Sequence, residues 1–237
     1  MLQRDAFIKE IIKKLNNDKN IFFLSADFGA AALDDLRELF PNNFLHCGIS
    51  EQAMLDIASG LALDGNKVFV YAMAPFLSLR AIEQTKCGAG VMNLPICLLS
   101  VGIGLGYADA GPTHYSTEDF ACFRAIIGSS VYTPADVPST RLIAKDILEN
   151  PKFSYIRLDR DVLPNIYPEI THSDFNNGYK VFGKIDNKKT AFISHGRMFH
   201  RCFELYNKEP NKFICVDIFR SKPFPKDLPK KISSCKG

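Results

Sequence analysis

Short apolar runs alternate with helix-like patterns along the first two thirds of the chain. Five runs rich in β-branched and aromatic residues predict buried strands, at 21–26, 68–73, 96–101, 130–133 and 155–158. Such continuous apolar runs are typical of a parallel sheet that is covered on both faces. Intervening stretches predict the covering helices, at about 3–16, 30–39, 51–63, 76–91 and 137–149. The alternation predicts an α/β fold with an open, mostly parallel sheet and helices on both faces.

Two of these helices carry a recognisable start signal. Ser50 precedes the helix that begins at Glu51, and Asp136 precedes the helix that begins at Val137. Serine and aspartate are favoured as N-caps because their side-chain oxygens accept hydrogen bonds from the free N–H groups of the first turn. We therefore expect both residues to be N-caps.

The pattern lapses after about residue 161, where prolines, asparagines and a glycine predict irregular structure. We place a first domain at 1–163, a linker at 164–178 and a second unit at 179–237. The second unit shows two strands and one helix, at 190–194, about 199–208 and 213–218. These are too few elements for an independent core. The second unit is therefore expected to pack against something else, or to be a truncated α/β domain.

Composition narrows the class of protein. Hydrophobic residues make up 46% and charged residues 23% of the 237 residues, which suits a globular chain with a sizeable core. A net charge of +3 is too small to indicate nucleic acid or an anionic membrane as a partner. The sequence shows neither a signal peptide nor an apolar stretch of membrane-spanning length. The seven scattered cysteines form no C-x-x-C motif, which favours buried thiols in a reducing compartment and a cytoplasmic protein.

Three segments carry the candidate chemistry: C-G-I-S-E-Q-A-M at 47–54, A-P-F-L at 74–77 and G-L-G-Y-A-D-A-G-P-T-H at 104–114. The first resembles the G-I-x-E segment of transketolases, deoxyxylulose-phosphate synthases and the β subunits of 2-oxo-acid dehydrogenases. The third resembles the G-x-G-P-T-H segment of transketolases in particular. The resemblance extends from about Arg4 to Leu163 and weakly beyond. The chain is thus similar to the transketolase domain that binds the pyrimidine ring of thiamine diphosphate.

The resemblance implies four cofactor-binding residues. Glu51 corresponds to the glutamate that hydrogen-bonds N1′ of the aminopyrimidine and so activates the cofactor, whose own chemistry does the rest. A glutamate that opens a helix in an apolar setting suits this role, because burial lets a carboxyl group share a proton. Phe76 corresponds to an aromatic residue that stacks on the pyrimidine. Ile82 stands where many relatives have an aromatic wall, and Asp27 follows the first strand at the cofactor edge of the sheet. The alternative is a solvent-facing Glu51 and a core Phe76.

The same resemblance implies residues that contact the sugar. His114 matches the histidine that contacts the donor hydroxyl groups and assists proton movement. Asp109 lies close to the family's hydroxyl-binding aspartate, although Ala110 is the residue in strict register. The loop is two residues longer than in transketolases, so the stereochemical preference is expected to differ. The alternative for His114 is a loop histidine on the surface.

Two arginines match the residues that hold the terminal phosphate of the sugar. Arg4 and Arg160 are suited to phosphate because a guanidinium presents a bidentate fork, although each alone is more often a surface residue. Ser100 replaces a histidine and Ala31 replaces a serine of the same phosphate site. With two of the four contacts missing, the resemblance leaves open a nucleotide-linked or otherwise modified sugar.

A complete transketolase also needs a domain that binds the diphosphate and Mg²⁺, marked by a G-D-G…N motif. No such motif occurs here, since L-D-G-N at 63–66 is a helix-ending turn. We therefore expect the C-terminal subunit of a split transketolase, a thiamine-diphosphate-dependent transferase that acts on sugars in carbohydrate metabolism. It would share thiamine diphosphate with an N-terminal subunit that supplies the Mg²⁺ ligands, as a dimer of heterodimers. The alternatives are a β subunit of a 2-oxo-acid dehydrogenase or another thiamine-diphosphate enzyme, and a non-catalytic relative.

Overall fold

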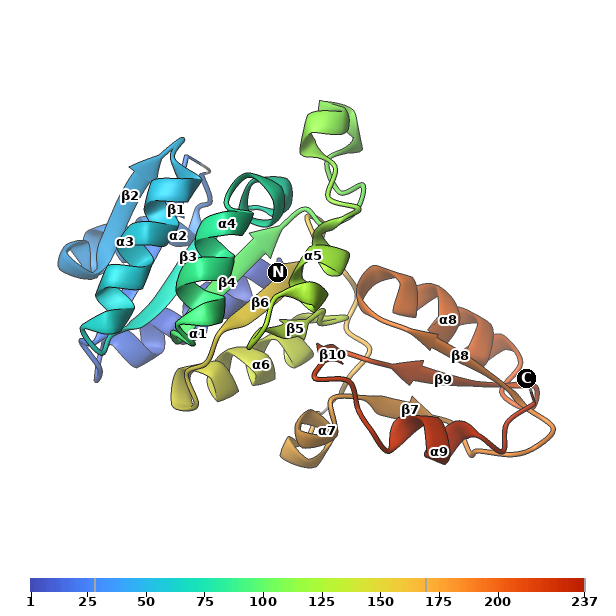
Figure 1. Ribbon diagram of the computed structural model, residues 1–237. Helices are drawn as coiled ribbons and strands as arrows, with labels where there is room; N and C mark the ends of the chain where they lie inside the picture. The colour runs from blue at the N-terminus through green and yellow to red at the C-terminus, as the bar shows by residue number, and fades with distance from the viewer. Residues whose placement is uncertain (28, 169, 237) are drawn as a thin grey trace.

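A seven-stranded sheet forms the centre of the first part of the chain (Figure 1). The computed structural model describes residues 1–27, 29–168 and 170–236. The strands are ordered β10-β5-β6-β4-β3-β1-β2, and every neighbouring pair is parallel except β10 and β5. Their bounds are β1 (Ile21–Ala26), β2 (Phe44–Gly48), β3 (Lys67–Met73), β4 (Ile96–Val101), β5 (Ser130–Tyr132), β6 (Ser154–Leu158) and β10 (Arg220–Lys222). The predicted open, mostly parallel sheet is confirmed.

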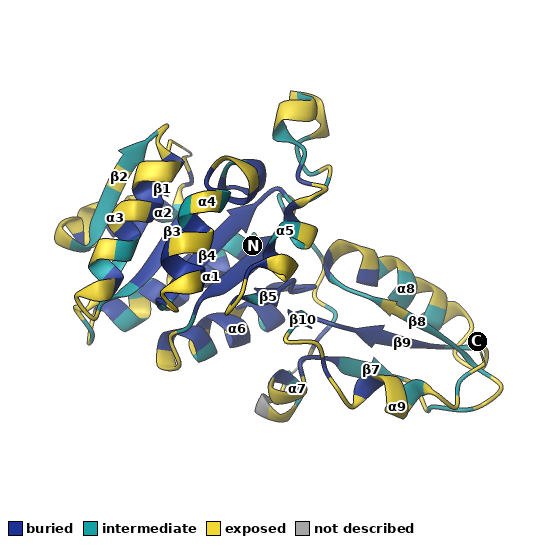
Figure 2. Cartoon of the chain, viewed as in Figure 1, coloured by how far each residue is buried: buried dark blue, intermediate teal, exposed yellow. Residues whose placement is uncertain are grey.

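Helices cover both faces of this sheet, so the strands are buried from both sides (Figure 2). One apolar layer packs under α1 (Gln3–Leu15), α2 (Ala32–Leu39) and α6 (Val137–Glu149). The other packs under α3 (Glu51–Leu63) and α5 (Asp119–Ala125). Phe23 and Phe69 face the first layer, whereas their neighbours Leu24 and Val70 face the second. Because side chains alternate between the faces of a strand, a sheet with two covered faces needs the continuous apolar runs seen in the sequence.

The two expected N-caps behave differently. Asp136 caps α6 as predicted, since its side chain accepts a hydrogen bond from the Ser139 backbone N–H at 2.9 Å within a capping box. Ser50 occupies the N-cap position of α3, but its hydroxyl donates to the carbonyl of Cys47 and leaves the helix without a side-chain cap. The tight turn that the Cys47–Ser50 bond closes sets the direction in which α3 leaves β2.

The segment 76–91 is not the regular α-helix that its pattern predicts. It consists of two π-helical stretches, η2 (Phe76–Arg80) and η3 (Thr85–Val91), on either side of the short α4 (Ile82–Gln84). The glycine-rich end of the segment packs closely on α3, where a Cβ atom at Gly88 would lie 2.3 Å from the Ser59 hydroxyl oxygen. Such wide turns are rare in proteins and occur frequently at functional sites.

The remaining helical turns and strands are short. The 3₁₀ turns are η1 (Pro41–Asn43), η4 (Ala108–Ala110) and η5 (Pro112–His114). The hydrophobic pattern of the sequence did not predict strand β2 or helix α5. The residues of β2 are half-buried or exposed because the strand lies at the edge of the sheet, so it lacks the continuous apolar signal of the central strands.

The second unit contains a three-stranded sheet ordered β7-β9-β8, in which β8 is parallel and β7 antiparallel to β9. Its elements are β7 (Lys180–Phe182), β8 (Thr190–Ser194), α8 (Gly196–Lys208), β9 (Phe213–Asp217) and α9 (Leu228–Ile232). The sequence pattern had indicated only two strands and one helix here. Strand β7 is three residues long and half-buried, which is too short for a periodic signal.

Several contacts join the second unit to the first. The expected linker is not irregular throughout, because it contains α7 (His172–Asn177), whose Phe175 lies in the first core and stacks on Tyr132 with ring centroids 6.1 Å apart. After β9 the chain returns to the large sheet, where β10 pairs with β5. At the start of α8, His195 stacks on Phe120 of α5 at 5.4 Å. The small sheet therefore packs against the first domain, because its own apolar core is too small to be stable alone. The domain boundaries themselves stay a prediction.

A buried carboxyl group at this junction makes stability depend on pH. Asp217 is fully buried at the end of β9 and accepts a hydrogen bond from the Tyr167 hydroxyl at 2.6 Å. Burial raises the pKa of Asp217 to about 8, so the folded protein holds a proton that the unfolded chain releases near pH 4. The contribution of Asp217 to stability is therefore complete below about pH 4 and is lost as the pH rises through about 8.

We expect the Asp217→Asn variant, which is neutral at every pH, to lose this dependence. Relative to the variant, the wild-type protein should lose on the order of 3 kcal/mol of unfolding free energy between pH 5 and pH 8. Urea unfolding at several pH values measures the difference. Parallel stability curves for the two proteins would show that Asp217 is ionised in the folded state.

Candidate active site

A pocket of about 310 Å³ opens at the carboxyl edge of the parallel sheet, beside the start of α3. Its lining comprises Ala26, Asp27, Ile49, Glu51, Ala72, Met73, Phe76, Arg80 and His114. The carboxyl ends of parallel strands meet at one edge, which is where open α/β sheets bind ligands. The structure thus brings together four of the residues that the sequence marked as functional, namely Asp27, Glu51, Phe76 and His114.

Glu51 is buried, although glutamate is an ionisable residue and Glu51 is the first residue of α3. It is 3% exposed, and its Oε2 accepts a hydrogen bond from Nη1 of Arg80 at 2.6 Å. The N-terminus of α3 adds a favourable environment for negative charge. The alternative of a solvent-facing glutamate is therefore excluded by its position.

Phe76 forms the aromatic wall of the pocket. Its ring lies edge-on to the ring of His114, with centroids 5.5 Å apart and planes at 71°. The guanidinium carbon of Arg80 lies 4.1 Å from the centroid of the same Phe76 ring. Phe76 is half-buried at the pocket and is not enclosed in the core.

Arg80 is a site residue that the sequence pattern did not reveal. It follows Phe76 by four positions in the same helical segment, and residues with that spacing lie near one another on a helix surface. The signal was therefore present, but an arginine in an exposed helix is ordinary, and its partner Glu51 is distant in sequence. Only the packing of η2 on α3 shows the contact.

His114 comes from a loop that projects from the body of the protein (Figure 1). The loop is closed at its base by two backbone hydrogen bonds between Gly104 and Ser116, of 3.0 and 2.8 Å. Gly111 joins η4 to η5 with φ +83°, a backbone conformation that favours glycine. The Nδ1 atom of His114 lies 2.9 Å from the hydroxyl of Thr113, which constrains the imidazole.

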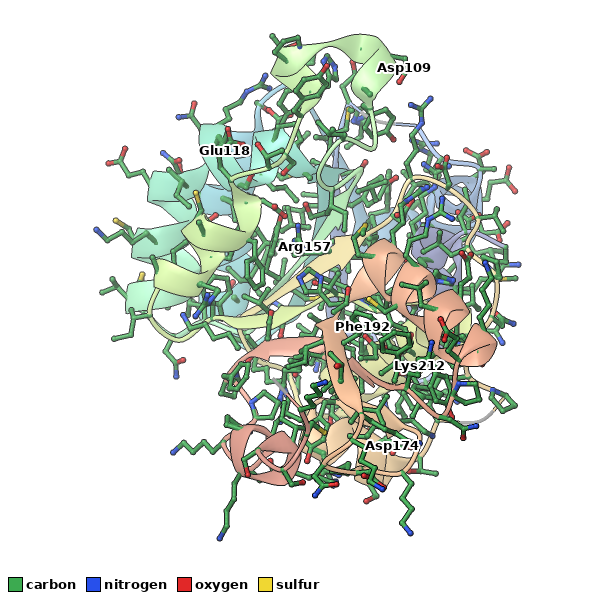
Figure 3. The ribbon with its side chains drawn as sticks, turned by 90° about the vertical axis from the view of Figure 1, so that its right-hand side faces the viewer. Asp109, Glu118, Arg157, Asp174, Phe192 and Lys212 are labelled. Atoms are coloured by element: carbon green, nitrogen blue, oxygen red, sulfur yellow. The ribbon has the colours of Figure 1, made fainter. Side chains whose placement is uncertain are left out.

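The predicted substrate-binding residues Asp109 and Arg160 contact each other. Nη1 of Arg160 lies 2.5 Å from Oδ1 of Asp109, and Nη2 lies 3.3 Å from Oδ2. The hydrogen bond from Arg160 lowers the pKa of Asp109. Figure 3 shows Asp109 at the outer end of the loop. Arg160 also lies 4.5 Å from the ring centroid of Tyr107. Burial raises the pKa of Tyr107, and the positive charges of Arg4 and Arg160 both oppose that shift, so the two arginines lie around one tyrosine.

Ser100 and Ile82 lie outside the pocket around Glu51. Ser100 is fully buried on β4, and its hydroxyl is 2.8 Å from the Tyr155 hydroxyl. Tyr155 donates to Asp119 at 3.0 Å, and Arg157 bonds both oxygens of the same carboxylate at 2.7 and 3.0 Å. Arg157 lies inside the body of the protein (Figure 3). Ile82 is half-buried against the second core layer. The expected substrate contact of Ser100 and cofactor contact of Ile82 stay predictions.

A doubly wound α/β domain with a buried glutamate and an aromatic ring at its carboxyl edge is the arrangement expected of a domain that binds the pyrimidine ring of a cofactor. The family model described as transketolase, pyrimidine binding domain matches residues 1–165, and the chain belongs to this family. The chain is 33% identical, over 85% of its length, to a subunit of the apulose-4-phosphate transketolase of Phocaeicola vulgatus and spans 64% of that subunit. It is 26% identical, over 96% of its length, to a putative transketolase C-terminal section of Methanocaldococcus jannaschii and spans 73% of it.

Solved structures agree with this assignment. A split gene transketolase described as an inactive β4 tetramer superimposes with a TM-score of 0.85 at 26% identity, covering 100% of this chain and 77% of that one. The family resemblance and the fold class predicted from the sequence are both confirmed.

The residues present suit an aminopyrimidine. The pocket has apolar walls from Ala72 and Met73, an aromatic face from Phe76 and a buried carboxyl group from Glu51. A planar group with N–H donors already meets both Phe76 and Glu51, because the Arg80 guanidinium does so. Within 1–27, 29–168 and 170–236, no group of three or more His, Cys, Asp or Glu side chains is placed to hold a metal ion. No helix in the same ranges has the length and apolar character needed to cross a membrane.

The buried ion pair beneath the loop should be important for stability. Arg157 and Asp119 are 8% and 0% exposed, so Arg157→Met leaves a carboxylate buried without its counter-ion. We expect a loss of about 3–5 kcal/mol in the free energy of unfolding, measured by urea denaturation. Arg160→Met is the control, because its ion pair with Asp109 is exposed and should matter far less. Equal effects of the two substitutions would contradict this account.

Proposed function

We propose that this chain is the C-terminal subunit of a split, thiamine-diphosphate-dependent transketolase. It transfers a two-carbon ketol unit from a ketose to an aldose. A partner subunit binds the diphosphate and Mg²⁺, and the active assembly is a dimer of heterodimers in the cytoplasm. The observation that carries the proposal is the buried Glu51, which shares one pocket with Phe76 and His114. A relative whose name makes it one subunit of a transketolase and a similar split gene transketolase structure support it.

Three pocket residues have roles in this proposal, namely Glu51, Phe76 and His114. Glu51 hydrogen-bonds N1′ of the pyrimidine, and Phe76 supplies the stacking surface. Asp27 borders the same pocket. Thiamine diphosphate, when bound, supplies the carbon nucleophile that cleaves the bond next to a ketose carbonyl. His114 enters from the loop, where it contacts donor hydroxyl groups and moves a proton. Because the loop projects over the edge of the sheet, a substrate bound there is held between the loop and the pocket.

The polar end of the substrate lies toward Arg4 and Arg160. Both arginines lie near Tyr107, and Asp109 of the loop pairs with Arg160. A sugar whose far end is anionic suits the two arginines, and Asp109 competes with it for Arg160. The relative from Phocaeicola vulgatus is named for a phosphorylated sugar, which makes phosphorylated donors the first to test.

Substitution of Glu51 tests the proposal. With the chain co-purified with its diphosphate-binding partner, Glu51→Ala should lower kcat for ketol transfer by about 10²–10⁴-fold, the usual contribution of a proton-transferring side chain. Glu51→Gln should be similarly impaired, because an amide cannot share a proton with N1′. Glu38→Ala, at an exposed glutamate on α2, is the control and should keep full activity. Normal turnover by Glu51→Ala would exclude the mechanism.

Two other functions give different outcomes in the same experiments. A β subunit of a 2-oxo-acid dehydrogenase would decarboxylate 2-oxo acids and transfer the product to a lipoyl group. The His114 loop favours ketol transfer instead, since it resembles the transketolase segment in particular. A non-catalytic relative would bind no cofactor even with its partner present.

Substitution of Asp109 tests the substrate end. Asp109 occupies the fork of Arg160, so a terminal phosphate on the donor must compete with it. We expect Asp109→Asn to lower KM for a phosphorylated donor about three- to tenfold, the range of a modest charged contact. KM for the same sugar without phosphate should not change. Asp34→Asn, which removes an exposed aspartate paired with Arg37 on α2, is the control. An equal change for both donors would show that Asp109 does not act through Arg160.

A further inference from the structure

Arg80 makes, within one side chain, the two contacts that an aminopyrimidine requires in this pocket. Its Nη1 donates to the buried carboxylate of Glu51 at 2.6 Å, and its guanidinium lies over the Phe76 ring at 4.1 Å. A guanidinium is planar and delocalised and stacks on aromatic faces, as an aminopyrimidine does. Both groups can form a hydrogen bond with the carboxyl group, the guanidinium by donating an N–H and N1′ of the pyrimidine by sharing a proton with Glu51. Arg80 therefore resembles the ring that Glu51 and Phe76 are placed to hold.

The two contacts are exclusive in space. A ring that stacks on the pocket face of Phe76 and hydrogen-bonds Glu51 would occupy the volume that the guanidinium fills. Carbon atoms approach no closer than about 3.5 Å without repulsion, so the two groups cannot share one face of the phenyl ring. Either Arg80 or the pyrimidine can hold this position at a given time.

The Arg80 side chain is also placed so that it can move out of the pocket. Its side chain is 40% exposed, whereas Glu51 is almost completely buried. The guanidinium is already partly in contact with water, so it loses little solvation when it moves outward, provided that another group takes its place beside Glu51. Glu51, by contrast, is almost completely buried and needs a hydrogen-bond partner at all times, since an unpaired buried polar or charged group is costly. The exchange replaces the hydrogen bond from Arg80 with one in which Glu51 and N1′ share a proton, so Glu51 keeps a partner throughout.

We propose that Arg80 is an internal placeholder that pairs with Glu51, stacks on Phe76 and is displaced when the aminopyrimidine of the cofactor binds. This inference rests on the proposed function and adds a competing, positioning residue to it. The consequence is a coupling between cofactor binding and the movement of a positive charge from the pocket to its mouth. Arg80 thereby weakens the apparent affinity for the cofactor while it keeps the pocket ordered.

Isotope-labelled arginine tests this without any assay of activity. The probe is thiamine, added to the chain in complex with its diphosphate-binding partner. The Nε–Hε signal of Arg80, assigned by its loss in Arg80→Ala, should shift and narrow when thiamine binds. The signal of Arg37 is a matched control, because Arg37 is 39% exposed, pairs with Asp34 at 2.7 Å and lies over the Phe44 ring at 5.3 Å. It should stay unchanged.

The affinity for thiamine provides the second measurement. Calorimetry should show that Arg80→Ala binds thiamine about three- to tenfold more tightly than the wild type, because the competitor is gone. Arg37→Ala should bind as the wild type does. Arg80→Lys, which keeps the charge but loses the planar fork, should lie between wild type and Arg80→Ala.

The outcomes separate the placeholder from the proposed function. If thiamine binds while the Arg80 signal does not move, or if Arg80→Ala binds thiamine more weakly, Arg80 holds the cofactor and the placeholder is refuted while the function stands. If thiamine binds neither the wild type nor Arg80→Ala, both proposals fail together. A circular dichroism spectrum of Arg80→Ala that matches the wild type at the temperature of the binding measurement excludes loss of the fold as the cause.

Discussion

A buried carboxylate must have a hydrogen-bond donor, and this requirement shapes the whole pocket edge of the protein. Glu51 is held at the start of α3 inside an apolar crevice, where an ionised group without a partner would cost several kcal/mol. Arg80 meets the requirement from η2, a π-helical stretch that packs against α3. Arg80 is the last residue of η2, so the path of η2 beside α3 places the guanidinium next to Glu51.

The sheet supplies the frame on which this pair is built. Parallel strands covered on both faces bring the ends of β1 and β3 to one edge, where α3, η2 and the His114 loop also meet. The loop is pinned at its base by the Gly104–Ser116 bonds and at its outer end by the pairing of Asp109 with Arg160. Beneath it, Arg157 and Asp119 form a buried ion pair that ties α5 to β6. The loop thus has an exposed ion pair at its outer end, and the chain that follows it enters α5, where Asp119 belongs to a buried polar network.

The second unit is held to this frame by short elements. Strand β10 returns to the edge of the large sheet, and α7 inserts Phe175 into the first core. These contacts compensate for the small apolar core of the three-stranded sheet, which would be marginal alone. The buried Asp217 lies at this junction, where burial raises its pKa to about 8. A polar group with a large pH response thus sits where the two units meet.

The sequence alone determined the long elements and the pocket residues that belong to local motifs. Continuous apolar runs predicted the central strands, and the capping signal at Asp136 predicted the start of α6, because both depend on neighbouring residues. Glu51, Phe76 and His114 were found through short motifs that resemble a known family. The hydrophobic pattern did not predict five further elements, because they are short or partly exposed and contact segments that are distant in sequence. These elements are β2, β7, β10, α5 and α7.

Only the tertiary structure decided which charges meet. The pairing of Arg80 with Glu51 joins residues 29 positions apart, and that of Arg160 with Asp109 joins residues 51 positions apart. Ser100 lies within a buried network with Tyr155, which no local motif indicates, and its contact with the substrate stays a prediction. Ion pairs and hydrogen bonds of side chains depend on angstrom-scale positions, whereas a hydrophobic pattern depends on residue type and period alone. Helices and strands can therefore be predicted from the hydrophobic pattern of the sequence, whereas the tertiary structure decides which polar side chains become partners.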